Sequence, residues 1–104
     1  MALKTRGAVR LLVDSIAGSG VGFPAASIPP ADPLVQAIKC TVERAPIRFN
    51  TQGVVTADGS NGSPIRYPGA VFTVFGGSDM AGFRALPAVG YDYAYLMIEF
   101  QGTG

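Results

Sequence analysis

The stretch QAIKCTVERAPIRFN, residues 36–50, decides the fold of this chain, because two alternating runs meet in it with almost no polar linker between them. Apolar residues occupy every second position from Ile38 to Val42, and the alternation resumes after Pro46 and continues to Phe49. This period of two is typical of β-strands with one buried face. Proline cannot donate a hydrogen bond to a sheet, so Pro46 marks an edge, a bulge or a corner where the chain passes between sheets. A strand that bends without a loop is typical of a two-layered antiparallel sandwich.

Other strand-like runs lie on both sides of this stretch. They are AVRLLVD at residues 8–14, AVFTVF at 70–75, a short run near 83–86 and YAYLMIEF at 93–100. Segments rich in glycine and proline separate these runs, and no long window keeps a helical period free of both residues. We therefore expect an all-β fold, an antiparallel β-sandwich or jelly-roll-like domain of about six to eight short strands with little or no helix. No internal repeat or domain boundary is visible, so residues 1–104 are expected to form a single domain.

The longest connection is GSGVGFPAASIPPADP, residues 18–33. Its hydrophobic residues, among them Phe23 and Ile28, predict that it is held against the surface as an edge segment or a short extended strand. A phosphate-binding interpretation of GSGVGF fails, because Pro24 stands where the required helix would begin. One short helix over residues 33–39 is an alternative to the all-strand assignment.

The stretch TADGSNGSP, residues 56–64, carries two turn signals, Asp-Gly and Asn-Gly, because these residues tolerate positive φ. We expect a surface hairpin or loop at this position. The residues expected to be exposed on it are Asp58, Gly59, Ser60, Asn61, Gly62 and Ser63. A calcium loop would need a downstream glutamate and further ligand positions that are missing here, so no metal is expected.

The composition is that of a weakly charged domain. The 104 residues are 48% hydrophobic and 14% charged, with a net charge of +1, whereas soluble domains carry about 25% charged residues. A chain of this length buries roughly 65% of its unfolded surface and normally needs more polar covering. The low charge therefore predicts burial in a homo-oligomer or against a larger partner.

The distribution of charge and apolar residues excludes several partners. The charges are scattered singly, which argues against nucleic acid. No apolar run approaches the ~20 residues of a membrane span. The N-terminal run has the superficial order of a signal peptide, but Arg10 and Asp14 interrupt it. We expect a first strand there and a soluble protein, made in a cytoplasm and not exported by a cleaved signal.

The sequence lacks the residue combinations that form the common catalytic sites. The chain has no histidine, which excludes Ser-His-Asp and Cys-His sites and imidazole metal sites. Its acidic residues form no recognisable glycosidase pair. The single cysteine, Cys40, cannot form an intramolecular disulfide and lies in an alternating run, so we expect a small buried hydrophobe. We expect no enzyme, no catalytic residue and no cofactor.

The tyrosines Tyr67, Tyr91, Tyr93 and Tyr95 are the candidates for recognition. Tyr93, Tyr95 and Met97 lie on one face of an alternating strand, and together with Tyr91 they form the candidate interaction surface. Tyrosine offers apolar area and a hydroxyl, so this face predicts a sugar-stacking or protein-docking platform. The alternative is that these side chains fill a second core layer or a subunit interface.

Two arginines, Arg48 and Arg84, stand between apolar neighbours on expected strands. Each is expected either to extend into solvent or to form a structural salt bridge or interface contact with a carboxylate such as Glu43 or Glu99.

The order of four features gives the chain a resemblance to a known class of proteins. They are an Ala-Pro-Ile-Arg strand in VERAPIRFNTQG, a Pro-Gly turn and a Phe-Arg-Ala strand in PGAVFTVFGGSDMAGFRAL, and a terminal alternating strand in AYLMIEF, with a turn-rich insert after the first. This order, over about residues 35–101, resembles small virion proteins of tailed phages. Residues 53–67 depart from the more regular, threonine-rich turn of that pattern. The resemblance implies a β-sandwich component of a phage particle and carries no catalytic residues across.

The resemblance and the low charge together lead to a first functional expectation: a bacteriophage structural protein that decorates or cements the capsid. It would be a homo-oligomer in the virion and would dock on the major capsid protein. The alternatives are a receptor- or carbohydrate-binding module of a tail or fibre, and a head-to-tail connector or tail-terminator component.

Overall fold

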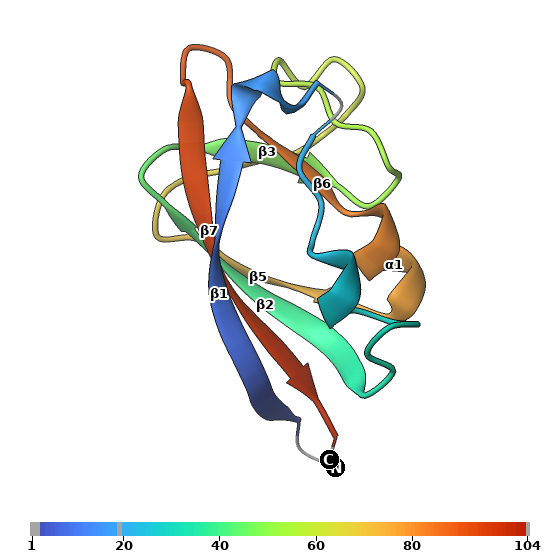
Figure 1. Ribbon diagram of the computed structural model, residues 1–104. Coiled ribbons are helices and arrows are strands. Elements are labelled where there is room, and N and C mark those ends of the chain that lie inside the picture. The colour runs from blue at the N-terminus through green and yellow to red at the C-terminus, as the bar shows by residue number, and fades with distance from the viewer. Residues whose placement is uncertain (1–2, 19, 104) are drawn as a thin grey trace.

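The computed structural model describes residues 3–18 and 20–103 of the single domain expected from the sequence. The described chain forms seven strands, one short α-helix and two 3-10 turns, which confirms an all-β sandwich of two antiparallel sheets (Figure 1). The elements are β1 (Lys4–Asp14), η1 (Ser15–Ala17), η2 (Ala25–Ser27), β2 (Val35–Glu43), β3 (Ile47–Asn50), β4 (Ile65–Arg66), β5 (Val71–Phe75), α1 (Gly77–Gly82), β6 (Arg84–Pro87) and β7 (Tyr93–Gly102).

The two sheets differ in size. The four-stranded sheet has the order β1-β7-β2-β5, and the three-stranded sheet has the order β4-β3-β6. Strands β1 and β7 pair along almost their whole length, from Lys4 opposite Gly102 to Asp14 opposite Tyr93. This long ribbon projects beyond the three-stranded sheet, so that the molecule measures 41 × 23 × 20 Å and both chain ends lie at the same end of it (Figure 1).

The corner expected at Pro46 is confirmed, because β2 ends in the four-stranded sheet and β3 begins in the three-stranded one. Three residues make the transfer, and Arg44 adopts φ 77°, a conformation that few residues other than glycine occupy. Ile47 then enters the core, with no exposed surface, opposite Pro87 of β6. The alternative helix over residues 33–39 is wrong, since Val35 already belongs to β2 and the strand pairs with both β5 and β7.

The core contains a row of four stacked phenylalanines. Phe23 stacks on Phe83 at 4.2 Å between ring centroids, Phe83 lies 5.7 Å from Phe49, and Phe49 stacks on Phe72 at 4.3 Å. The row joins both sheets to the connection between β1 and β2. That connection is held against the body as the sequence predicts, and its Val21 forms a two-bond bridge with Ala85 of β6.

The helix α1 is the element that the alternation pattern does not reveal, although it agrees with the expectation of little helix. It contains two terminal glycines and buries Met80, which is 1% exposed. Gly82 is required by space, because a Cβ at that position would overlap the carbonyl oxygen of Thr51. The end of the short helix therefore packs directly against the backbone at Thr51, and a side chain at position 82 would prevent this contact.

Two isoleucines give a matched test of this core. Ile47 has no exposed surface, whereas Ile16 is 87% exposed. We expect Ile47→Ala to lower the free energy of unfolding by about 2–5 kcal/mol through lost burial and a residual cavity. Ile16→Ala should change it by less than about 0.5 kcal/mol. Denaturant unfolding followed by circular dichroism measures both, and equal effects of the two substitutions would contradict the placement of β3 in the core.

Candidate interaction surface

Tyrosines and arginines form a row on the outer face of the four-stranded sheet. Tyr93 and Tyr95 alternate with buried residues of β7, and their rings meet edge to face at 5.6 Å. The guanidinium carbon of Arg44 lies 3.7 Å from the ring centroid of Tyr93, and that of Arg10 lies 4.0 Å from the ring centroid of Tyr95. Arg10 Nε in turn lies 3.3 Å from Glu43 Oε1. The row thus connects β1, β7, β2 and the corner that follows β2.

The corner positions the first member of this row. With φ 77°, Arg44 turns back toward β7, where its side chain also donates a hydrogen bond of 3.3 Å to the carbonyl oxygen of Tyr93. Each exposed cation–π contact contributes about 0.5–1 kcal/mol, and an exposed ion pair such as Arg10–Glu43 at most about 1 kcal/mol. One face of each tyrosine ring is therefore occupied by a guanidinium group. Met97 lies on the same outer face, 36% exposed, beside Arg10 across the β1–β7 ladder.

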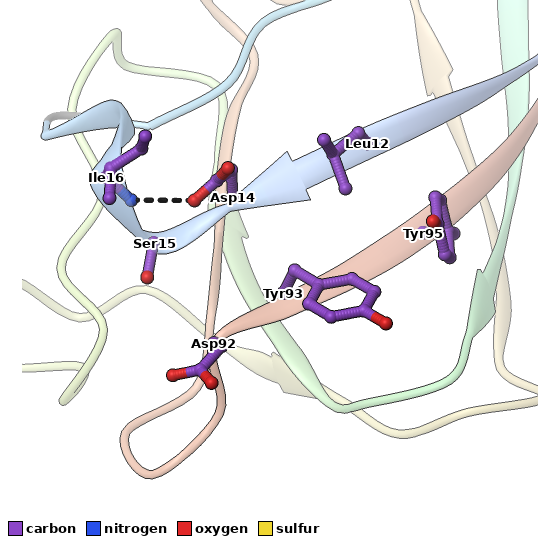
Figure 2. Close-up of a pocket in the computed structure, with 7 residues that line it drawn as sticks. All are labelled: Leu12, Asp14, Ser15, Ile16, Asp92, Tyr93 and Tyr95. Atoms are coloured by element: carbon purple, nitrogen blue, oxygen red, sulfur yellow. Dashed lines mark hydrogen bonds between the residues drawn. The ribbon is translucent and has the colours of Figure 1, made fainter.

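A hollow of about 480 Å³ opens where β1 ends and β7 begins (Figure 2). Its lining residues are Leu12, Asp14, Ser15, Ile16, Asp92, Tyr93 and Tyr95. Asp14 accepts a 3.0 Å hydrogen bond from the backbone N–H of Ile16, drawn in Figure 2, which fixes the 3-10 turn η1. The backbone N–H of Ser15 donates to the carbonyl oxygen of Asp92 at 3.0 Å. The hollow therefore has apolar walls, two carboxylates at its rim and an ordered backbone.

Tyr91 lies apart from Tyr93 and Tyr95, in the turn between β6 and β7. It lines a second hollow with Tyr67, Val89 and Asp58. A third hollow shares Val89 and Asp58 with the second and Ser15 with the first. The three hollows are therefore contiguous over the end of the sandwich at which Figure 1 shows the turn η1 and the loops between strands.

Several of the exposed large apolar side chains lie on this end of the molecule. We use the name loop-end surface for Ile16, Tyr67, Val89 and Tyr91, whose exposed fractions are 87%, 62%, 66% and 47%. The turn that carries Val89 is tied to the neighbouring loop by a 3.2 Å hydrogen bond from its N–H to the carbonyl oxygen of Ala57. The surface is thus apolar and built on loops that are bonded to one another.

The loop over residues 58–63 is partly as expected. Asp58, Ser60, Asn61 and Gly62 are exposed, and Asp58 accepts a 2.9 Å hydrogen bond from the backbone N–H of Ser60. This bond, with help from the Ser60 hydroxyl, holds the pKa of the Asp58 carboxyl below its ordinary value.

Two residues of that loop correct the prediction of exposure. Ser63 is 2% exposed, because its hydroxyl is hydrogen-bonded to Asn50 and Asn61. Gly59 is half-buried, and a Cβ there would touch the guanidinium of Arg48. The loop is therefore folded back on the three-stranded sheet rather than projecting along its whole length.

Among the described residues, neither Arg48 nor Arg84 forms the salt bridge with Glu43 or Glu99 that was one of the expected alternatives. Arg48 donates a 2.9 Å hydrogen bond to the carbonyl oxygen of Ser63, and Arg84 donates to two carbonyl oxygens at the end of α1. Both arginines belong to the three-stranded sheet, whereas Glu43 lies on the other sheet and pairs with Arg10. The sequence places Arg10 on an alternating strand, but its partner depends on the register of β1 against β7 and β2.

The structure also bears on metal and thiol chemistry. In residues 3–18 and 20–103, no three His, Cys, Asp or Glu side chains gather as metal ligands. No helix of this described part is long and apolar enough to cross a membrane. Ser19, part of the glycine-rich stretch considered above, lies outside the described residues.

Cys40 has no exposed surface, and burial raises the pKa of its thiol to about 12.

The burial of Cys40 predicts an unreactive thiol. At about pH 8 an ordinary exposed cysteine is partly thiolate and reacts readily, whereas we expect the folded protein to consume no thiol reagent on the timescale of a free cysteine. The same sample in denaturant should react completely. A chromogenic disulfide reagent measures both, and rapid reaction of the folded protein would contradict the core position of β2.

Comparison with known proteins gives no relative for this chain, since no protein-family model, no curated protein and no solved structure matches it. Any function assigned to the chain therefore rests on its own residues and their arrangement.

Proposed function

We propose that this chain is a non-enzymatic structural subunit of a tailed-phage particle and docks on the major capsid protein as a decoration or cement subunit. The observation that carries the proposal is the loop-end surface, where large apolar side chains stand exposed on loops that are bonded to one another. Contiguous apolar surface of this kind marks protein interaction sites.

The make-up of the loop-end surface favours a protein partner. Tyrosine is enriched at the centres of protein interfaces, where its ring is buried and its hydroxyl finds a partner. Tyr67 and Tyr91 provide two such rings beside the aliphatic Val89, and the charged side chains in the lining are Asp58 and Arg48. Because backbone hydrogen bonds already order these loops, docking costs little additional conformational entropy.

The charge of the chain supports the same partner. A net charge of +1 and 14% charged residues provide little attraction for a phosphate backbone. On a symmetric shell, many equivalent sites let each copy contribute a modest interface. Lys4 and Gly102 pair at the end opposite the loops, so docking through the loop-end surface leaves the β1–β7 end pointing away from the shell (Figure 1). The phage identity itself comes from the resemblance in the order of the four sequence features.

The number of copies per particle tests the proposed role. Quantitative mass spectrometry of purified particles should find this chain at roughly hundreds of copies relative to the major capsid protein, since only the shell lattice offers that many equivalent sites. A count of roughly a dozen or fewer would instead support the alternative of a connector, tail-terminator or fibre component. Absence from particles would overturn the virion proposal.

Substitutions on the loop-end surface test the docking site. We expect Ile16→Asp and Val89→Asp each to weaken binding to shells that lack this protein by at least about tenfold, because each puts a charge into an apolar interface. The control is Leu34→Asp, an aliphatic residue 43% exposed next to Gly102 at the far end. Circular dichroism verifies the fold of each variant. Equal binding by all four proteins would place the docking site elsewhere.

The hollow in Figure 2 favours a second candidate, a receptor- or carbohydrate-binding module. Aromatic walls with a few polar groups at the rim are typical of small-ligand sites, and Tyr93, Tyr95, Asp14 and Asp92 provide both. A guanidinium group lies over one face of each tyrosine ring, and the two rings meet edge to face, which holds both rings in place beside the hollow.

Binding to a glycan array or to host cells tests this second candidate. If it is right, Tyr93→Ala and Tyr95→Ala abolish binding without unfolding the domain, whereas Tyr67→Ala, outside the hollow, leaves binding intact. Unchanged binding by the Tyr93 and Tyr95 variants would remove this candidate.

A further inference from the structure

The sandwich has four sheet edges, and three of them are closed to the addition of another strand. β4 is two residues long, which is too short to guide a partner strand. The free side of β6 is taken by the connection before β2, through hydrogen bonds of 2.8 and 2.9 Å between Val21 and Ala85. These two edges belong to the three-stranded sheet.

The third protected edge is β1, which is long and exposed but carries Lys4, Arg6 and Arg10. A second copy pairing antiparallel around Gly7 would place Lys4 opposite Arg10, and like charges in that position are destabilising. The register shift between Thr5 and Gly7 further disturbs the edge. Charged side chains and bulges are the usual means by which proteins prevent edge-to-edge association.

The fourth edge, β5, has none of these protections. Its sequence, VFTVF, contains no charge, and Val71 and Phe75 are 55% and 64% exposed. One side of β5 pairs with β2, from Thr41 opposite Val71 to Ala37 opposite Phe75. Among the described residues, no other strand pairs with its second side.

The sequence of β5 also complements itself. If two copies pair antiparallel with Thr73 opposite its own counterpart, Val71 lies opposite Phe75 and Phe72 lies opposite Val74. Each aromatic side chain then meets a β-branched one, and the two threonines meet at the centre; both kinds of cross-strand pair are favourable. A shift by one residue would pair outward with inward faces, and a shift by two would leave Val71 or Phe75 without a partner strand residue.

We propose that β5 is a self-association edge, through which two copies of this chain join their four-stranded sheets in an antiparallel pair across a two-fold axis at Thr73. The partner is a second copy because the strand is complementary to itself and carries no charge to select a different one. The proposal does not depend on the capsid role, since it concerns the purified protein in solution. The loop-end surface is not part of this edge, so a dimer keeps it available.

Lys39, which lies opposite Thr73 on β2, allows a specific test of the proposed dimer. Thr73 lies opposite Lys39 within one copy and opposite Thr73 of the second copy in the proposed dimer. In Thr73→Glu the new carboxylate can therefore pair with Lys39 inside the monomer, while two carboxylates oppose each other across the dimer. Thr73→Lys gives the opposite charge, and a mixture of the two variants restores attraction across the dimer axis.

Sedimentation equilibrium of the full chain at about 0.1 mM measures the dimer, since an interface with a micromolar Kd is then mostly occupied. We expect the unmodified chain to dimerise, each single variant to dimerise at least about tenfold more weakly, and the equimolar mixture to recover dimerisation. Thr5→Glu, an exposed threonine on the β1 edge, should leave the dimer unchanged.

Three outcomes would overturn the proposal. The first is a monomeric unmodified chain at that concentration. The second is a dimer that persists in both Thr73 variants. The third is a mixture of folded variants, verified by circular dichroism, that does not recover dimerisation, because the proposed register brings residue 73 of the two copies together. Loss of shell binding with dimerisation intact, or the reverse, separates this edge from the loop-end surface.

Discussion

The reversal between β2 and β3 is the constraint on which the rest of the structure depends. Three residues carry the chain from one sheet to the other, with a 3.0 Å hydrogen bond from the N–H of Ala45 to the carbonyl oxygen of Glu43 and with Arg44 at φ 77°. The transfer places Ile47 in the core and turns the Arg44 side chain over Tyr93. One local backbone arrangement thus closes the sandwich and builds one end of the outer tyrosine row.

Order in the loops comes from two different interactions. The connection before β2 is held by the stacking of Phe23 on Phe83 and by its bridge to β6. The loops that carry the loop-end surface are held by hydrogen bonds, such as the one from the N–H of Ser15 to the carbonyl oxygen of Asp92. Ile16 and Val89 on these loops consequently stay exposed and available for contact with a partner.

Alternation in the sequence is sufficient to predict the strands other than the two-residue β4, the corner at Pro46 and the burial of Cys40, because each is a local consequence of a period of two. Features that depend on the register between strands could not be predicted from one sequence. Glu43 pairs with Arg10 rather than with Arg48, since it faces β1 across β7. Likewise Ser63 is buried by Asn50, a residue thirteen positions away along the chain. Neither the ion pair of Glu43 nor the hydrogen bond of Ser63 can be predicted from the spacing of these residues along the sequence.

The pairing of Lys4 with Gly102 has a mechanical consequence. Hydrogen bonds of an antiparallel ladder run perpendicular to the strands, so a load applied between the two chain ends acts along the bonds of the β1–β7 ladder. Such a load opens one bond after another, as a zipper opens, instead of shearing all of them together. The described domain therefore yields readily to tension between its ends, whereas a load between the loop end and the paired ends acts lengthwise along β1 and β7.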